Sequence, residues 1–161
     1  MICLYVDGML IFGTDHGQVD QCKSFLSSSF SMKDMGEADV ILGIKIKRSD
    51  KGISLTQSHY IESVLKKFNC RDNTPVTSPM DPNVKLVPST VKPDSQLEYS
   101  RVIGYLMYIM TCTRLDIALA VGKLSRYTKN PSMLHWQAIN RVLKYLKSTK
   151  HFGLTYGGYP S

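Results

Sequence analysis

Three features of the sequence predict an α+β fold. Short β-prone runs joined by turn residues fill the amino-terminal part, beginning with residues 2–6. A proline-rich segment, residues 73–96, follows them. Beyond it, apolar residues recur at helical spacing as far as residue 148. With 161 residues, 43% of them hydrophobic and 20% charged, the chain is long and apolar enough to bury a core.

The first predicted elements are a hairpin and a helix. Residues 2–6 and 9–12 form the two strands, and Asp7 and Gly8 form the two-residue turn that strongly favours a hairpin. Thr14 or Asp15 then caps a helix. Its apolar residues are spaced for one face to pack on a sheet, and they are Val19, Cys22, Phe25, Leu26 and Phe30.

A second hairpin and helix follow. Residues 40–47 and 53–55 alternate as strands do, and Gly52 lies in the turn between them. Ser58 begins a helix, which Lys66 and Lys67 stabilise near its carboxyl end through the helix dipole. The apolar stripe of this helix is Tyr60, Ile61, Val64, Leu65 and Phe68.

The proline-rich segment is predicted to be an extended connector and the main boundary in the chain, because five prolines block regular helix across residues 73–96. Three helices are expected after it, over residues 97–111, 116–128 and 132–148. Residues 152–156 form a short strand whose partner is expected to be missing. The chain therefore looks cut from a longer polypeptide at both ends.

Composition narrows the classes of protein only slightly. A net charge of +7 suits a polyanionic partner, but many unrelated proteins share it. The four cysteines form no CxxC pair, so reduced thiols and a cytoplasmic or nuclear location are expected. The longest apolar stretch, residues 102–112, is too short to cross a bilayer, so we expect no membrane partner.

The motif at the first hairpin is specific. Tyr5-Val6-Asp7-Gly8 resembles the Tyr-Val-Asp-Asp hairpin of copia-type retrotransposon reverse transcriptases. Further segments resemble the same family in the same order, and together they cover nearly the whole chain. They are Leu42-Gly43-Ile44, residues 52–57, residues 99–108, residues 113–117, residues 124–127, His135-Trp136 and residues 141–147. Leu115 departs from the family, which has proline there.

This resemblance implies a polymerase that lacks its catalytic apparatus. The family joins nucleotides with two Mg²⁺ ions, held by one earlier aspartate and two adjacent hairpin aspartates. Only Asp7 matches them, Gly8 replaces the second hairpin aspartate, and the earlier aspartate would precede Met1. We therefore expect an inactive chain that binds no Mg²⁺, or binds it weakly at Asp7. A simpler interpretation is that Asp7 is only a turn residue.

Two groups of basic residues are predicted to bind nucleic acid. Lys45, Lys47 and Arg48 lie where the family grips the primer strand, although such residues also protect edge strands from aggregation. Arg141, Lys144 and Lys147 recur at three-residue steps, as on a thumb helix that follows a duplex. A solvated helix face looks the same. His135 is expected to pack beside Trp136 rather than to bind a metal.

By resemblance, residues 1–72 are a partial palm, 73–96 the connector, 97–150 a thumb- or connection-like helical unit, and 151–161 the start of a link toward ribonuclease H. The predicted function is that of a fragment of an RNA-directed DNA polymerase. Its partners would be an RNA or DNA primer–template and the rest of a Pol polyprotein. The alternative is a domesticated, non-catalytic module that binds nucleic acid or protein. A cysteine hydrolase using Cys3 or Cys112 is disfavoured, because no base stands in a recognisable arrangement.

Overall fold

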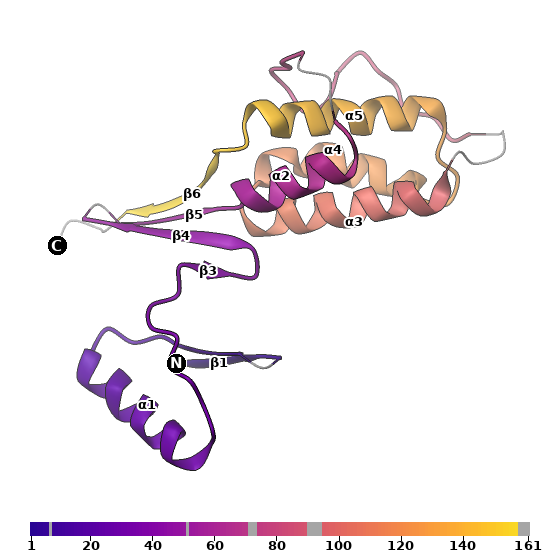
Figure 1. The fold of residues 1–161 in the computed structure, drawn as a ribbon. Coiled ribbons are helices and arrows are strands. Elements are labelled where there is room, and N and C mark those ends of the chain that lie inside the picture. Colours follow the sequence, from indigo (N-terminus) through magenta and orange to yellow (C-terminus); the bar gives the residue numbers. More distant parts are fainter. Residues whose placement is uncertain (7, 51, 71–73, 90–94, 158–161) are drawn as a thin grey trace. The chain divides into compact units, whose positions relative to one another are not determined.

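The β-prone runs form antiparallel strands and the helical patterns form helices, which confirms the mixed α and β composition of the fold (Figure 1). The computed structural model describes residues 1–6, 8–50, 52–70, 74–89 and 95–157. The chain divides into two compact units, Met1–Ala38 (unit 1) and Asp39–Ser161 (unit 2). The predicted domain boundaries do not coincide with this division and stay predictions.

The hairpin of unit 1 forms, but its turn differs from the prediction. Strand β1 (Ile2–Tyr5) pairs with β2 (Gly8–Ile11), and Tyr5 lies opposite Gly8. Gly8 is therefore a strand residue, and the turn begins one residue earlier than expected. Val6 follows β1 with a φ of 49°, in a region that β-branched residues rarely occupy. Asp7 lies outside the described residues.

Helix α1 (His16–Ser29) begins as predicted, because the Asp15 carboxylate accepts hydrogen bonds from the backbone N–H groups of Gly17 and Gln18. Its predicted apolar face is half-buried at Val19, Cys22 and Leu26, and its packing onto a sheet stays a prediction. None of its residues is fully buried, and Phe25 and Phe30 are 68% and 61% exposed. A small unit with one hairpin and one helix has too little surface to cover every apolar side chain.

Unit 2 contains one antiparallel sheet with the strand order β3-β4-β5-β6. Its strands are β3 (Val40–Ile41), β4 (Ile44–Ser49), β5 (Gly52–Thr56) and β6 (Gly153–Gly157). The single strand predicted over residues 40–47 is wrong, because Leu42 and Gly43 have φ values of 52° and 75° and turn the chain between β3 and β4.

The last strand has its partner within the chain, contrary to expectation. Strand β6 pairs with β5 over five residues, from Gly52 opposite Gly157 to Thr56 opposite Gly153. This pairing depends on glycine, because a Cβ atom at Gly153 would lie 2.2 Å from the Leu55 carbonyl oxygen. Periodicity alone does not reveal a partner about 100 residues away in the sequence.

Four α-helices complete the described part of unit 2, beside one end of the sheet (Figure 1). They are α2 (Ser58–Lys67), α3 (Gln96–Cys112), α4 (Ala118–Leu124) and α5 (Met133–Ser148). Short 3₁₀ turns, η1 (Leu115–Ile117) and η2 (Ser125–Tyr127), flank α4. This agrees with the predicted helices, except that the middle one is interrupted at both ends.

The helices of unit 2 enclose its hydrophobic core. Each fully buried aliphatic side chain contributes about 1.5–3 kcal/mol of transfer free energy, so this cluster is the main source of stability. Its residues with no exposed surface are Ile61, Tyr99, Val102, Leu106, Ile109, Ile117, Ile139, Val142 and Leu146.

In the described part of the chain, no helix combines the length and the apolar character that a membrane crossing needs.

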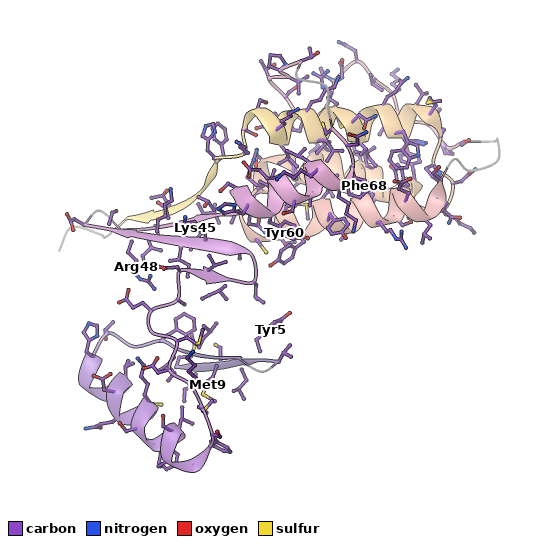
Figure 2. All side chains as sticks on the ribbon, in the orientation of Figure 1. Tyr5, Met9, Lys45, Arg48, Tyr60 and Phe68 are labelled. Atoms are coloured by element: carbon purple, nitrogen blue, oxygen red, sulfur yellow. The ribbon has the colours of Figure 1, made fainter. Side chains whose placement is uncertain are left out.

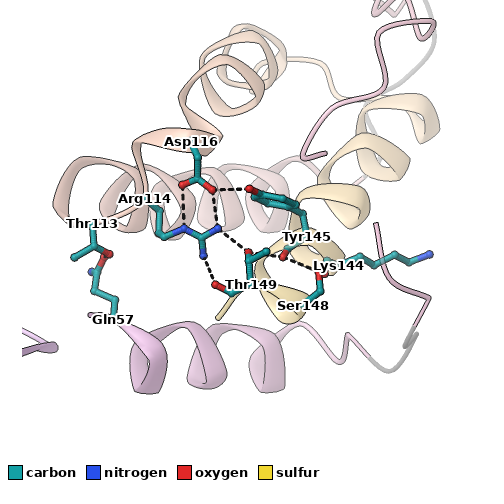
Figure 3. Close-up of polar contacts among 8 residues, drawn as sticks. All are labelled: Gln57, Thr113, Arg114, Asp116, Lys144, Tyr145, Ser148 and Thr149. Atoms are coloured by element: carbon teal, nitrogen blue, oxygen red, sulfur yellow. Dashed lines mark hydrogen bonds and ion pairs between the residues drawn. The ribbon is translucent and has the colours of Figure 1, made fainter. Parts of the chain in front are cut away.

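A buried arginine joins three parts of unit 2 (Figure 3). Arg114, at the start of η1, is 1% exposed and donates two hydrogen bonds to the Asp116 carboxylate, at 2.9 and 2.7 Å. It also donates to the backbone oxygen and the hydroxyl of Thr149, just after α5. Its guanidinium lies 5.5 Å from the Tyr145 ring centre and 5.6 Å from that of Phe152, which precedes β6.

Arg114, Asp116, Tyr145, Thr149 and Phe152 form the Arg114 cluster, in which the Asp116 carboxylate stays ionised. Burial opposes ionisation of Asp116, but hydrogen bonds from Arg114 and from the Tyr145 hydroxyl outweigh it and lower the pKa of the carboxyl below its ordinary value. Burial, followed by the nearby carboxylate, raises the pKa of Tyr145. Every polar group of the cluster therefore has a partner, which a buried guanidinium requires.

We predict opposite effects for two glycine-to-alanine substitutions. Gly153→Ala forces the β5 backbone to shift, and should lower the free energy of unfolding by about 1–3 kcal/mol in a denaturant titration. Gly104→Ala, in α3, meets nothing within 4 Å and should raise it by about 0.5–1 kcal/mol. Equal effects of the two substitutions would contradict the assigned β5–β6 register.

We predict that Asp116→Asn destabilises unit 2 by about 1–3 kcal/mol at neutral pH, because Arg114 loses its counter-charge. Folding lowers the pKa of Asp116, so the ionised carboxylate stabilises the folded state at pH values above its ordinary pKa of about 4. This contribution to the free energy of unfolding is lost as the pH falls below that value. Denaturant titrations of both proteins from pH 7 to pH 3 should show the difference shrinking. The exposed Asp20→Asn serves as the control; a pH-independent difference would refute this role.

Candidate nucleic-acid interface

The tip of the first hairpin is where the sequence predicts a remnant metal ligand. Asp7 lies outside the described residues, so its role stays a prediction. Gly8 is described, and a Cβ atom there would lie 3.4 Å from the Tyr5 carbonyl oxygen, an ordinary contact. The backbone therefore does not require glycine at this position, and an aspartate would fit.

The absence of a two-ion Mg²⁺ site at this hairpin stays a prediction. Such a site needs several carboxylate oxygens close together. Gly8 supplies none, and the structure, over the residues it describes, brings together no group of three or more His, Cys, Asp or Glu side chains able to hold a metal. The strained φ of Val6, just before Asp7, is a local feature typical of functional turns.

Strand β4 separates the three basic residues that the sequence grouped together. Its register with β5 is regular, with Lys45 opposite Thr56, Lys47 opposite Ser54 and Arg48 opposite Ile53. Since alternate residues of a strand point to opposite faces, Lys45 and Lys47 share one face and Arg48 lies on the other. Figure 2 labels Lys45 and Arg48 on this strand. Lys45 and Lys47 are therefore the pair that one face of the sheet presents together, and nucleic-acid binding by the three residues stays a prediction.

The Lys45 face of the sheet borders an open cleft next to α2. The cleft has a volume of about 240 Å³ and is lined by Val40, Gly43, Lys45, Thr56, His59, Tyr60 and Ser63. Tyr60 forms one wall, where its ring packs edge-on against Tyr108 at 5.0 Å between centroids (Figure 2). Burial raises the pKa of the Tyr60 hydroxyl above its ordinary value.

Sequence reasoning missed the polar side of α2. His59 and Ser63 are exposed and four residues apart, so they lie on one side of the helix and reach the same cleft as Lys45. Their spacing, opposite the apolar stripe of α2, was the available signal. Nothing in the sequence pattern, however, showed that this side of the helix borders β4.

A row of polar residues extends the Lys45 face outward. Lys47 on β4, Ser54 on β5 and Thr155 on β6 are cross-strand neighbours, and the hydroxyls of Ser54 and Thr155 lie 3.1 Å apart. The opposite face carries Arg48, Ile53 and Tyr156 in the equivalent row. One face is therefore basic and hydroxyl-rich, and the other is largely apolar.

The basic residues of α5 are in a different situation. Arg141 donates hydrogen bonds to the backbone oxygen and hydroxyl of Ser78 in the connector, at 3.2 and 3.3 Å. Lys147 donates to the Cys70 backbone oxygen at 2.9 Å. The Lys144 side chain extends away from the Arg114 cluster (Figure 3). Arg141 and Lys147 thus each bond to a distant part of the chain, and nucleic-acid binding by the three basic residues of α5 stays a prediction.

His135 packs against the rings of Tyr99 and Tyr127, and its predicted pairing with Trp136 stays a prediction. It is fully buried, and its Nδ1 atom accepts a hydrogen bond from the Ser132 backbone N–H at 2.9 Å. Burial lowers the pKa of its imidazole. This contact forms a capping box at the start of α5, and the ring also stacks on Tyr127. His135 is therefore a structural residue.

Comparison with known proteins identifies the class. The profile of the family "Reverse transcriptase (RNA-dependent DNA polymerase)" matches residues 1–82, which contain both the hairpin and the Lys45 face. The chain belongs to this family. The resemblance to copia-type retrotransposon reverse transcriptases that the motifs indicated is confirmed.

Individual relatives are similar along nearly the whole chain. The Retrovirus-related Pol polyprotein from transposon TNT 1-94 of Nicotiana tabacum is 44% identical over 98% of this chain and 13% of its own length. The corresponding polyprotein from transposon RE1 of Arabidopsis thaliana is 39% identical over 94% of this chain and 10% of its own. An uncharacterized mitochondrial protein of Arabidopsis thaliana is 33% identical over 95% of this chain and 63% of its own.

The chain thus spans only about a tenth of the length of the Pol polyproteins that it matches. No solved structure matches it.

Proposed function

We propose that this chain is a part of a reverse transcriptase that holds the sugar–phosphate backbone of a primer–template, and that it transfers no nucleotides by itself. The observation that carries the binding proposal is the pair Lys45 and Lys47 on one face of β4, beside the α2 cleft. Membership of the reverse transcriptase family and the net charge of +7 support it.

The geometry of this pair suits a repeating anion. Residues two apart on a strand lie about 6.6–6.8 Å from each other, a separation comparable with that of successive phosphates along one nucleic-acid strand. Ser54 and Thr155 add hydroxyl donors in the same row as Lys47. All these contacts are to phosphate or sugar, so binding should be strongly salt-dependent and independent of sequence.

The second half of the proposal rests on the hairpin. Phosphoryl transfer by two Mg²⁺ ions needs several carboxylates, and this sequence has Gly8 where the family has the second hairpin aspartate. The chain would therefore act as a binding part of a larger Pol polyprotein. A domesticated binding module is the second candidate, favoured by a backbone at Gly8 that would accept aspartate but carries glycine.

We predict that Lys47→Ala weakens binding of a primer–template duplex by about three- to tenfold, and reduces the slope of log affinity against log salt by about one, because one phosphate contact is lost. Arg48→Ala is the matched control, since it removes the same charge from the adjacent position on the opposite face. It should change the slope little. Fluorescence anisotropy from 50 to 200 mM salt measures both.

Equal effects of Lys47→Ala and Arg48→Ala would mean that only net charge matters, and would exclude the Lys45 face of the sheet as the binding surface. If the unmodified chain fails to bind the duplex at low salt, the binding function itself is excluded. Salt-independent capture of a protein would instead favour the interaction-module alternative.

We predict that the 161-residue chain extends no primer with either Mg²⁺ or Mn²⁺, and that Gly8→Asp alone does not restore extension, because a third carboxylate is still required. Incorporation of labelled nucleotide is the measurement, and Asp7→Ala is the background control. Incorporation above that background by the unmodified chain would refute the proposed inactivity.

A further inference from the structure

The described part of the connector, residues 74–89 (the strap), lies between two points at which side chains of the helical unit hold the chain. Before it, and before residues 71–73, Lys147 donates to the Cys70 backbone oxygen at 2.9 Å. Toward its end, the Tyr127 hydroxyl donates to the Leu86 oxygen at 2.9 Å and the Asn130 amide donates to the Ser89 oxygen at 2.7 Å. These bonds have ordinary lengths, so the chain is held firmly at Cys70 and at the carboxyl end of the strap.

In the middle of the strap Met80 packs against the hydrophobic core, and the polar contacts, which are weaker than those at the two flanking points, come from one side chain, Arg141. Arg141 reaches the Ser78 oxygen at 3.2 Å, the Ser78 hydroxyl at 3.3 Å and the Asp81 carboxylate at 3.7 Å. The Arg141 and Asp81 side chains are 31% and 35% exposed, so water screens their attraction. By comparison, the ion pair between Arg114 and Asp116 is shorter, at 2.7 Å, and its guanidinium is buried.

Asp81 is also the only acidic residue among residues 74–89. A phosphate or sulfate group binds a guanidinium through two parallel hydrogen bonds and carries more charge density than the Ser78 carbonyl. An external anion bound through the two terminal nitrogens of Arg141 takes the places of the Asp81 carboxylate and the Ser78 hydroxyl. Anion binding at Arg141 therefore competes with these two contacts to the strap.

We propose that the middle of the strap, around Ser78 and Asp81, is a releasable cover over Arg141, and that a polyanion bound along α5 displaces it. The two flanking points stay attached through Lys147, Tyr127 and Asn130. Because coupling between two binding events is reciprocal, weakening the strap must strengthen polyanion binding to the same degree. The strap thus limits how much of the basic α5 surface is available. This proposal concerns α5 and does not require the β4 surface.

Limited trypsin digestion tests the proposal, with heparin as the probe. Lys85 is exposed and is the only Lys or Arg within residues 74–89, so cleavage after it reports release of the strap. Heparin should accelerate this cleavage several-fold in the unmodified protein. A small peptide substrate in the same reaction corrects for any effect of heparin on trypsin itself.

Two variants and two matched controls separate the strap from general charge effects. Asp81→Ala should be cleaved rapidly without heparin, and should bind heparin more tightly by up to about fivefold, the ratio expected for an exposed ion pair. Asp20→Ala, which makes the same charge change on exposed α1, should do neither. Arg141→Ala should be cleaved rapidly with no further acceleration by heparin, whereas Arg101→Ala should behave like the unmodified protein.

Several results would overturn the proposal. They are heparin binding with unchanged cleavage after Lys85, no heparin binding at all, or equal affinities of Asp81→Ala and Asp20→Ala for heparin. These results are distinguishable from failure of the β4 surface. A duplex bound through Lys47 without any change at Lys85 would contradict the strap alone, and heparin-dependent cleavage with no effect of Lys47→Ala would contradict the β4 surface alone.

Discussion

The buried guanidinium of Arg114 is the contact on which the arrangement of unit 2 depends. It connects the end of α3, the end of α5 and the residue before β6 through hydrogen bonds of 2.7–2.9 Å and two aromatic rings. Removing one partner of a buried charged group destabilises the fold by more than the net free energy that the pair contributes, because the other charge is then left buried without compensation. Arg114 also contacts the ring of Phe152, the residue before β6, and β6 pairs with β5.

The sheet of unit 2 has two chemically different faces. Pairing of β6 with β5 places Thr155 beside Ser54 and Lys47, and Tyr156 beside Ile53 and thereby Arg48. The basic, hydroxyl-rich face borders the α2 cleft, so the groups suited to phosphate come from two distant parts of the sequence, residues 45–63 and Thr155. A contact that looks purely structural therefore supports the surface proposed to bind nucleic acid.

Positive charge alone did not show which basic residues face a partner. Arg114 and Arg141 are both arginines of the helical unit, but the first is buried against a carboxylate and the second holds the connector weakly at about one-third exposure. Lys47 is exposed on a sheet face, where an external anion can reach it. The net charge of +7 is the sum of groups with quite different availability, and only their contacts distinguish them.

The sequence by itself determined the family, the positions of most helices, the Asp15 cap and the absence of the second hairpin aspartate, because motifs, capping and periodicity are local properties. The sequence also showed that neighbouring strand residues alternate between faces, which separates Lys47 from Arg48. Grouping the basic residues by their position along the chain concealed this separation. Only the tertiary structure decided that β6 pairs with β5, that α2 borders the Lys45 face and that Arg141 holds the connector. Those contacts join residues about 15 to 100 positions apart, where side-chain shape and hydrogen bonding, rather than local pattern, select the partner.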